Sequence, residues 1–157
     1  MSRIKKEEDK MKRILVAVDR SEPSLRAVDF AAELAKKFDA GLLLLMAIGD
    51  VGRPDPGLES YIRAEHIKEP SSIYEIDSVR GGLSEVAERA RGKGAREVSV
   101  DVVVGDAAEL ILTSARSGPA DMIVMGSRGH GRLAGLLLGS VAQKVVGLAP
   151  CPVLVVH

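Results

Sequence analysis

Apolar positions along the chain follow two patterns, which predict alternating strands and helices. Short continuous runs rich in Val, Leu and Ile are typical of strands buried on both faces of a parallel sheet. Such runs cover residues 14–18, 42–48, 122–125 and 153–156, and residues 98–104 alternate apolar with more polar positions, as in a strand with one less buried face. Apolar residues that recur every three or four positions indicate amphipathic helices. These cover residues 25–38, 73–90, 108–115 and 140–148.

Local features refine this pattern. Ser21 and Ser24 are candidate N-caps of the first helix, because their side-chain oxygens can accept from free backbone N–H groups. Ser99 and Asp101 make one face of the third strand polar, which favours a position near a sheet edge. Residues 49–70 are rich in proline and lack a regular apolar period, so they are predicted to be irregular.

The alternation of strands and helices predicts one α/β domain, a doubly wound parallel sheet of five strands with helices on both faces. Residues 13–157 form this domain, and residues 1–12 form a charged, flexible leader. The leader lacks the apolar segment of a signal peptide. No apolar run reaches the roughly 18 residues of a membrane span, so no membrane partner is expected.

Composition narrows the class of partner further. The 22 Lys and Arg residues balance the 22 Asp and Glu residues, which argues against the basic surface that nucleic-acid binding requires. Cys151 is the single cysteine, so a disulfide framework and a cysteine zinc cluster are excluded. A reducing, cytoplasmic location fits best. Cys151 has no activating neighbour in the sequence, which favours a structural role over a nucleophilic one.

Two strand ends carry the candidate chemistry, because doubly wound sheets bind ligands at the carboxyl ends of their strands. Asp19 follows the first strand, either as a ligand contact or as a helix cap. The fourth strand runs into a loop that contains Gly126, Gly129, Gly131, Gly135 and Gly139. Glycines let backbone N–H groups approach a phosphate, and Arg128, Arg132 and a helix start at Ser140 add positive potential. The pattern predicts a phosphate-binding loop, with a flexible surface connection as the alternative.

Two common phosphate-binding motifs do not fit this loop. Gly126 and Gly131 have the spacing of a P-loop, but Arg132 stands where that motif requires lysine. Residues 129–134 match G-x-G-x-x-A, yet they do not directly follow a strand, and no ribose-binding acid follows the next strand. A P-loop and a Rossmann dinucleotide site are therefore both disfavoured.

The loop instead resembles the ATP-binding signature of the universal stress protein family. That signature, Gly-x2-Gly-x9-Gly-Ser, is filled by Gly126, Gly129, Gly139 and Ser140. The resemblance extends from residue 14 to residue 156. In this family the strands run in the order 3-2-1-4-5, which implies that Asp19 and Gly126 lie on either side of the point where the strand order reverses.

Carried over by position, the resemblance implies a set of nucleotide-binding residues. Ala17 and Ala47 would flank the adenine, and Asp19 would hydrogen-bond the ribose hydroxyls. The remaining residues, which would surround the ribose and phosphates, are Met125, Gly126, Ser127, Arg128, Gly129, His130, Gly131, Arg132, Gly139, Ser140, Val141 and Ala142. ATP normally carries a divalent cation, so Mg²⁺ or Mn²⁺ could bridge its phosphates, with no protein ligand assigned. Met46 departs from the histidine frequent in the family, with little consequence for binding.

The resemblance implies an ATP-binding regulatory protein of the stress response that acts as a nucleotide-dependent switch. No catalytic residue is assigned, because no paired carboxylates or nucleophile with its base can be identified. The apolar last strand, residues 153–156, would pair with a second copy to form a homodimer. Two alternatives stay open. One is a slow ATP hydrolase or phosphotransferase that needs a partner, and the other is a dimerising interaction module that binds AMP, cyclic AMP or no nucleotide.

Overall fold

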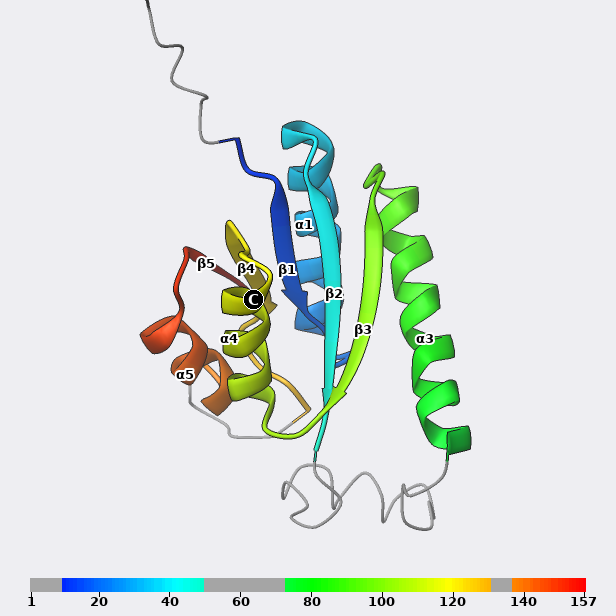
Figure 1. The fold of residues 1–157 in the computed structure, drawn as a ribbon, viewed down its shortest axis with the longest axis vertical. Helices are drawn as coiled ribbons and strands as arrows, with labels where there is room; N and C mark the ends of the chain where they lie inside the picture. Colours follow the sequence, from blue (N-terminus) through cyan, green and yellow to red (C-terminus); the bar gives the residue numbers. More distant parts are fainter. Residues whose placement is uncertain (1–9, 50–72, 131–136) are drawn as a thin grey trace, which may run out of the picture.

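Five strands form the centre of the molecule, with helices packed against both faces (Figure 1). The computed structural model describes residues 10–49, 73–130 and 137–157. The strands are β1 (Arg13–Ala17), β2 (Gly41–Ile48), β3 (Val98–Val104), β4 (Met122–Gly126) and β5 (Val153–Val156). The helices are α1 (Glu22–Phe38), α3 (Ile73–Gly92), α4 (Ala107–Ser117) and α5 (Ser140–Leu148). Every strand and helix expected from the sequence is present.

The strand order is β3-β2-β1-β4-β5, and all neighbouring strands are parallel. This confirms the doubly wound α/β fold and the implied order 3-2-1-4-5. Strand β1 lies in the middle, where Ala17 pairs with Leu45 of β2 and with Met125 of β4. The order of the strands reverses between β1 and β4, the place where folds of this type bind ligands.

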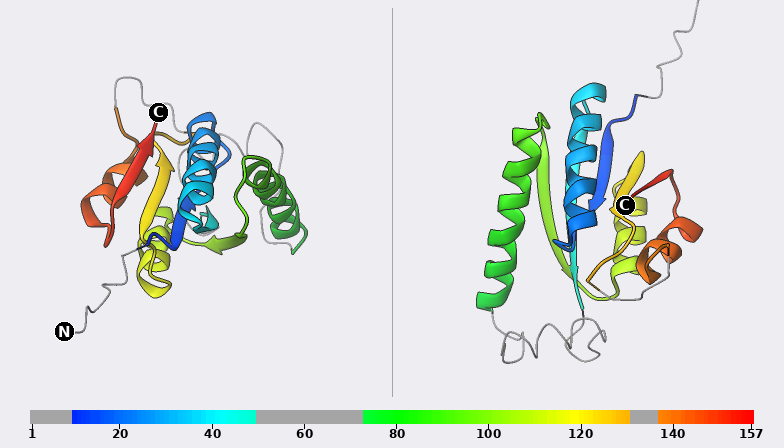
Figure 2. Two further views of the ribbon diagram at one scale, coloured as in Figure 1. Left: turned by 90° about the horizontal axis from the view of Figure 1, so that it is seen from above. Right: turned by 180° about the vertical axis from the view of Figure 1, so that it is seen from behind.

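The two faces of the sheet are covered by different helices. Helices α1 and α3 lie on one face, and α4 and α5 lie on the other (Figure 2). Successive side chains of a strand point to opposite faces. Ile14 and Val16 therefore pack on the α1 side while Leu15 packs on the α4 side, and all three are fully buried. This double burial explains the continuous apolar runs of the sequence.

Side-chain caps fix where the helices begin. Ser21 is the N-cap of α1, and its hydroxyl accepts a hydrogen bond from the backbone N–H of Ser24 at 3.4 Å. Asp106 caps α4 by accepting from the backbone N–H of Glu109 at 2.9 Å. Helix α1 ends at Asp39, whose φ of 56° is the left-handed conformation that commonly terminates helices. Ser21 is thus the cap among the two predicted serines.

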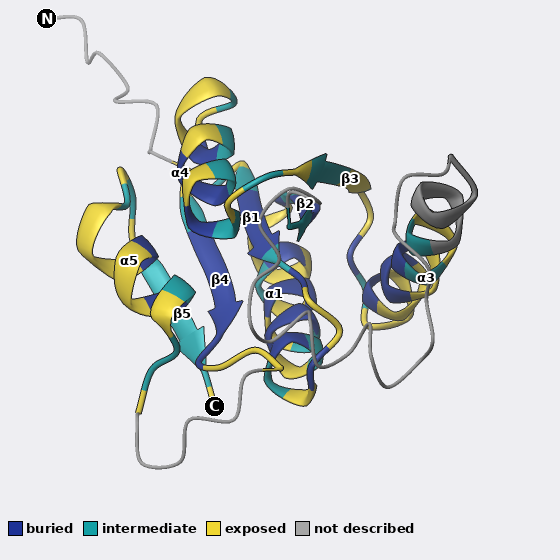
Figure 3. Ribbon diagram, turned by 90° about the horizontal axis from the view of Figure 1, so that it is seen from below, coloured by how far each residue is buried: buried dark blue, intermediate teal, exposed yellow. Residues whose placement is uncertain are grey.

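Strands β3 and β5 occupy the two edges of the sheet. The edge position predicted from the polar residues of the third strand is therefore confirmed. Strand β5 is half-buried along its whole length (Figure 3). Within the described ranges, no helix combines the length and the apolar character needed to cross a membrane. The irregular segment 49–70 lies outside the described residues from residue 50 onward, and residues 1–9 of the expected leader also lie outside them.

Candidate functional site

The carboxyl ends of β1 and β4 lie next to each other, because Ala17 and Met125 are paired at the end of the two strands. Asp19 follows β1, and the loop that begins with Ser127 follows β4. The two strand ends that carry the predicted chemistry are therefore brought to one place on the sheet.

Asp19 and the β4 loop are in direct contact. The Nε2 atom of His130 lies 2.6 Å from the backbone oxygen of Asp19. A Cβ atom added to Gly129 would lie 2.5 Å from Oδ2 of Asp19, so the absence of a side chain at Gly129 leaves room for this carboxylate. The other oxygen, Oδ1, accepts from the backbone N–H of Ser21 at 2.9 Å. Asp19 therefore caps a turn before α1, whereas Ser21 caps the helix itself.

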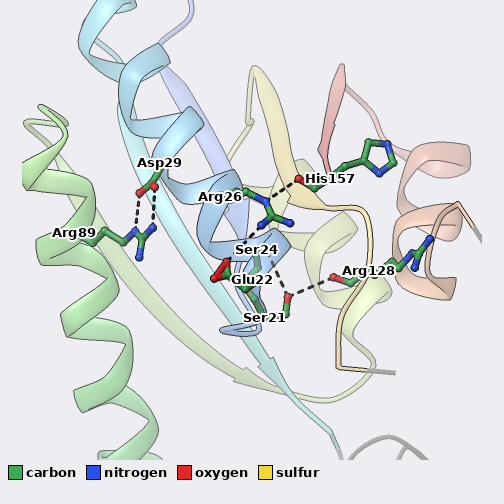
Figure 4. Close-up of polar contacts among 8 residues, drawn as sticks. All are labelled: Ser21, Glu22, Ser24, Arg26, Asp29, Arg89, Arg128 and His157. Carbon is green, nitrogen blue, oxygen red and sulfur yellow. Dashed lines mark hydrogen bonds and ion pairs between the residues drawn. The ribbon is translucent and has the colours of Figure 1, made fainter. Parts of the chain in front are cut away.

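Gly126 allows the end of β4 to pack against the first turn of α1. A Cβ atom at this position would lie 2.8 Å from the backbone C of Pro23 and 2.8 Å from the backbone N of Ser24. The hydroxyl of Ser21 also donates to the backbone oxygen of Arg128 at 3.4 Å (Figure 4). The start of the loop is thereby fixed to α1.

Ser127 connects the loop to two further elements. Its backbone N–H donates to the backbone oxygen of Val156 in β5, and its backbone oxygen accepts from the N–H of Gly139, both at 2.7 Å. The residue is only 3% exposed. No described residue hydrogen-bonds its hydroxyl, and a buried hydroxyl usually has a partner. The hydroxyl is therefore available to a bound ligand.

Helix α5 begins beside this loop with an uncapped N-terminus. Gly139 is the N-cap, and it offers no side chain to bond the first turn. Gln143 donates to the backbone oxygen of Gly139 at 2.9 Å, as the first i to i−4 bond of the helix. The N–H groups of Ser140, Val141 and Ala142 precede this bond and have no intrahelical acceptor. Such groups, together with the positive end of the helix dipole, favour an anion.

Lys144 of α5 makes ion pairs with two carboxylates at the start of α4. Its Nζ atom lies 3.2 Å from Oε1 of Glu109 and 3.5 Å from Oδ1 of Asp106. The hydrogen bond to Glu109 is the main cause that raises the pKa of Lys144, and Asp106 adds to the rise. This contact joins the helix that offers the free N–H groups to the rest of the α4 layer.

The structure thus brings together most of the residues singled out in the sequence. They are Asp19, Gly126, Ser127, Arg128, Gly129, His130, Gly139, Ser140, Val141 and Ala142. Ala17 ends β1, Met125 is buried beside it in β4, and Ala47 lies near the carboxyl end of β2 opposite Val103. Gly131 and Arg132 lie outside the described residues.

Some site contacts had no signal in the sequence. The bonds from Ser127 to Val156 and from Ser21 to Arg128 join segments far apart in the chain. The first bond uses backbone atoms that any residue supplies, and the second has a backbone oxygen as its acceptor, so residue type and spacing do not reveal the partners. No group of three or more His, Cys, Asp or Glu side chains that could hold a metal ion occurs in the part of the chain that the structure describes.

Comparisons with known proteins agree with this fold. The family model of the universal stress protein family matches residues 10–157, and the chain belongs to this family. A universal stress protein of Thermus aquaticus is 38% identical, covering 93% of this chain and 98% of its own. A universal stress protein of Methanocaldococcus jannaschii is 34% identical, covering 98% of this chain and 86% of its own.

A solved structure of a universal stress protein in complex with cAMP is also similar to this chain. The two are 31% identical, with a TM-score of 0.66, and the match covers 93% of this chain and 96% of that one. The similarity therefore extends over the whole sheet and both helical layers. That relative therefore binds cAMP, an adenine nucleotide.

Proposed function

We propose that this stress-response protein binds ATP at the carboxyl ends of β1 and β4 and acts as a nucleotide-dependent switch. The observation that carries the proposal is the contact between Asp19 and Gly129. The carboxylate of Asp19 lies where a side chain of residue 129 would stand, and it is exposed to solvent. Doubly wound folds bind ligands at the carboxyl ends of their strands, where the strand order reverses, and a carboxylate there can accept hydrogen bonds from the ribose hydroxyls.

The proposed phosphate contacts follow from the elements around Asp19. The free N–H groups at the start of α5 would donate to phosphate oxygens, and the buried hydroxyl of Ser127 would add one donor. Arg128, Gly129 and His130 belong to the same loop as Ser127. Ala17 and Ala47 would flank the adenine. A Mg²⁺ or Mn²⁺ ion would enter with the nucleotide through its phosphates.

A second candidate ligand is cyclic AMP, because a relative of 31% identity has been solved in complex with it. ATP and cyclic AMP share the adenosine that Asp19 would contact. They differ in the phosphate groups that would lie near α5: ATP has a triphosphate there, and cyclic AMP has a cyclic monophosphate. A direct comparison of the two ligands therefore separates the candidates.

The test combines thermal unfolding with calorimetric titration against ATP, ADP, AMP and cyclic AMP, each with and without Mg²⁺. A ligand at 100 times its dissociation constant stabilises the folded state by about 2.7 kcal/mol. We expect ATP to stabilise the wild type and not Gly129→Val, whose side chain would displace the Asp19 carboxylate. The matched control is Gly92→Val, since a side chain there meets nothing within 4 Å. The proposal fails if no adenine nucleotide binds the wild type.

We also propose that β5 pairs with β5 of a second copy. The backbone oxygens of Pro152 and Val156 accept from β4, so the alternating backbone groups of Val153 and Val155 point to the open edge of the sheet. Val155→Pro would remove one outward N–H without removing a bond to β4. We expect this variant to elute as a monomer in light-scattering chromatography, while Val155→Ala stays dimeric. A wild-type monomer at micromolar concentration would exclude the dimer.

A further inference from the structure

Two residues near the candidate site occur in places that their residue types disfavour. Arg20 has a φ of 65°, a left-handed conformation that non-glycine residues rarely adopt. Gly82 lies inside α3, a helix of 20 residues, although glycine is a poor residue for a helix interior. A strained backbone conformation and a helix-destabilising glycine that lie close together indicate a shared structural cause.

Arg20 and Gly82 are in contact with each other. A Cβ atom on Gly82 would lie 2.6 Å from Nη1 and 3.0 Å from Cζ of Arg20. The guanidinium group therefore occupies the space that the missing side chain of Gly82 leaves on the surface of α3. The neighbouring Gly81 has no atom within 4 Å of such a position. A Cβ atom at position 82 would therefore displace the guanidinium of Arg20, whereas one at position 81 would leave it in place.

The same arginine is the middle residue of the turn that holds Asp19. The N–H of Ser21 donates to Oδ1 of Asp19 at 2.9 Å, which closes the turn around Arg20. The other carboxylate oxygen of Asp19 faces Gly129. The short turn of residues 19–21 therefore makes two contacts. The guanidinium of Arg20 lies on α3, and the carboxylate of Asp19 lies beside the β4 loop.

Helix α3 is a firm support for this contact because it is tied to α1. Arg89 of α3 donates to both carboxylate oxygens of Asp29 in α1, at 2.7 and 2.8 Å (Figure 4). Lys93 adds a longer contact of 4.0 Å to the same carboxylate. Leu83, Val86 and Ala87 of α3 are buried in the same hydrophobic core as α1, which places Gly82 beside that helix.

We propose that Arg20 is a positioning residue, whose guanidinium group, seated on Gly82, fixes the turn that directs the Asp19 carboxylate into the nucleotide site. The inference deepens the proposed function and rests on it for the identity of the ligand. It makes α3 part of the binding machinery, although α3 supplies no direct contact to the nucleotide. A bound nucleotide would in turn hold Arg20 against α3.

The experiment compares Gly82→Ala with Gly81→Ala, two identical changes in one helix. Both improve the helix propensity, but only Gly82→Ala displaces the guanidinium of Arg20. Amide NMR spectra of the nucleotide-free proteins give the first readout. We expect Gly82→Ala to shift the signals of residues 19–21 and of Gly129, and Gly81→Ala to leave them unchanged. Titration with ATP gives the second readout, in which Gly82→Ala weakens binding about threefold to tenfold.

Arg20→Gly separates a positioning role from a merely structural one. Glycine adopts the left-handed backbone conformation without strain but lacks the guanidinium group. If Arg20 served only to hold that backbone conformation, Arg20→Gly would therefore bind ATP as tightly as the wild type. We expect Arg20→Gly to weaken ATP binding as much as Gly82→Ala does, and the double variant to be no weaker than either. Identical spectra at residues 19–21 for Gly81→Ala and Gly82→Ala would overturn the inference. Shifted spectra in a protein that binds no nucleotide would refute the proposed ligand and retain the role of Arg20 in fixing Asp19.

Discussion

The two ends of the parallel sheet differ in how they use charge. At the carboxyl end, the Asp19 carboxylate, a glycine-rich loop and the first N–H groups of α5 surround the candidate site. At the amino end, a cleft of about 480 Å³ is lined by Lys12, Arg13, Arg91, Arg96 and Glu97, among others. With four cations and one carboxylate among these residues, the amino-end cleft would by charge alone be a candidate anion site.

Helix direction explains part of the positive charge at the amino end. Helices α1, α3 and α4 end there, and each has basic residues in its last turn, where the helix dipole is negative. Arg91 donates to the backbone oxygen of Val98 at 3.1 Å, and Arg116 donates to that of Leu148 at 3.3 Å. These cations serve carbonyl groups of the protein. At the carboxyl end, the first N–H groups of α5 instead have no acceptor within the helix and no side-chain cap from Gly139, and such groups favour an anion.

The largest expected difference between the two ends is in packing, and Gly126 and Gly118 provide a matched test. A Cβ atom at Gly126 would meet the backbone of Pro23 and Ser24, whereas one at Gly118 would meet only the guanidinium of Arg13, which can move. We expect Gly126→Ala to lower the free energy of unfolding by about 1–3 kcal/mol. Gly118→Ala should change it by less than about 0.5 kcal/mol. Urea unfolding measures both, and equal stabilities would show that α1 can yield at Gly126.

Removing one charge at each end tests which end binds the nucleotide. Asp19→Ala removes the proposed ribose acceptor. Because hydrogen bonds to charged groups contribute about 1.5–3 kcal/mol, we expect the dissociation constant for ATP to increase at least about tenfold. Arg96→Ala removes a cleft cation whose side chain is 84% exposed, and we expect affinity within about twofold of the wild type. Calorimetric titration measures both values. The reverse ranking would move the site to the amino-end cleft.

The sequence predicted the strands and helices because the central strands are buried on both faces and each helix on one. The order of the strands was instead implied by the resemblance to the family. The spacing of Gly126, Gly129 and Gly139 likewise identified the loop. The physical reasons for these glycines were not predictable, since Gly126 accommodates α1 and Gly129 accommodates Asp19. The contact between Arg20 and Gly82 was also missed, because it depends on a left-handed φ and on helix packing across the fold.

Between the two ends, the Asp29–Arg89 ion pair ties α3 to α1, and its contribution should depend on pH. The hydrogen bond from Arg89 is the main cause that holds the pKa of Asp29 below its ordinary value. Because the folded-state pKa is lower than the unfolded one, the pair stabilises the protein above the unfolded pKa, and this contribution is lost as the pH falls through the folded value. Both side chains are partly exposed, at 23% and 44%.

We therefore expect Asp29→Asn to destabilise the protein by about 0.5–1 kcal/mol at pH 7. The difference from the wild type should shrink below about pH 4, where the carboxylate begins to accept a proton. Glu33→Gln removes a negative charge from an exposed position on the same helix and is the control. Urea unfolding at pH 3, 5 and 7 measures the effect. A constant difference across this range would mean that packing, rather than the ion pair, joins α1 and α3.

The smallest expected effect concerns Cys151, which precedes β5 at the amino end of the sheet. Burial raises the pKa of this thiol, and the nearby Asp121 carboxylate raises it further. Because the thiolate is the reactive form, we expect the folded protein to react more slowly with iodoacetamide at pH 8 than the urea-unfolded protein does.

Asp121→Asn should speed the folded-state reaction by less than about threefold, since burial is the larger cause of the raised pKa. Asparagine retains an acceptor for the N–H groups of Lys12 and Arg13, which donate to Oδ2 of Asp121 at 2.7 and 2.9 Å. A folded protein that reacts faster than the unfolded chain would instead identify an activated thiol, and would make the amino end a second site of chemistry.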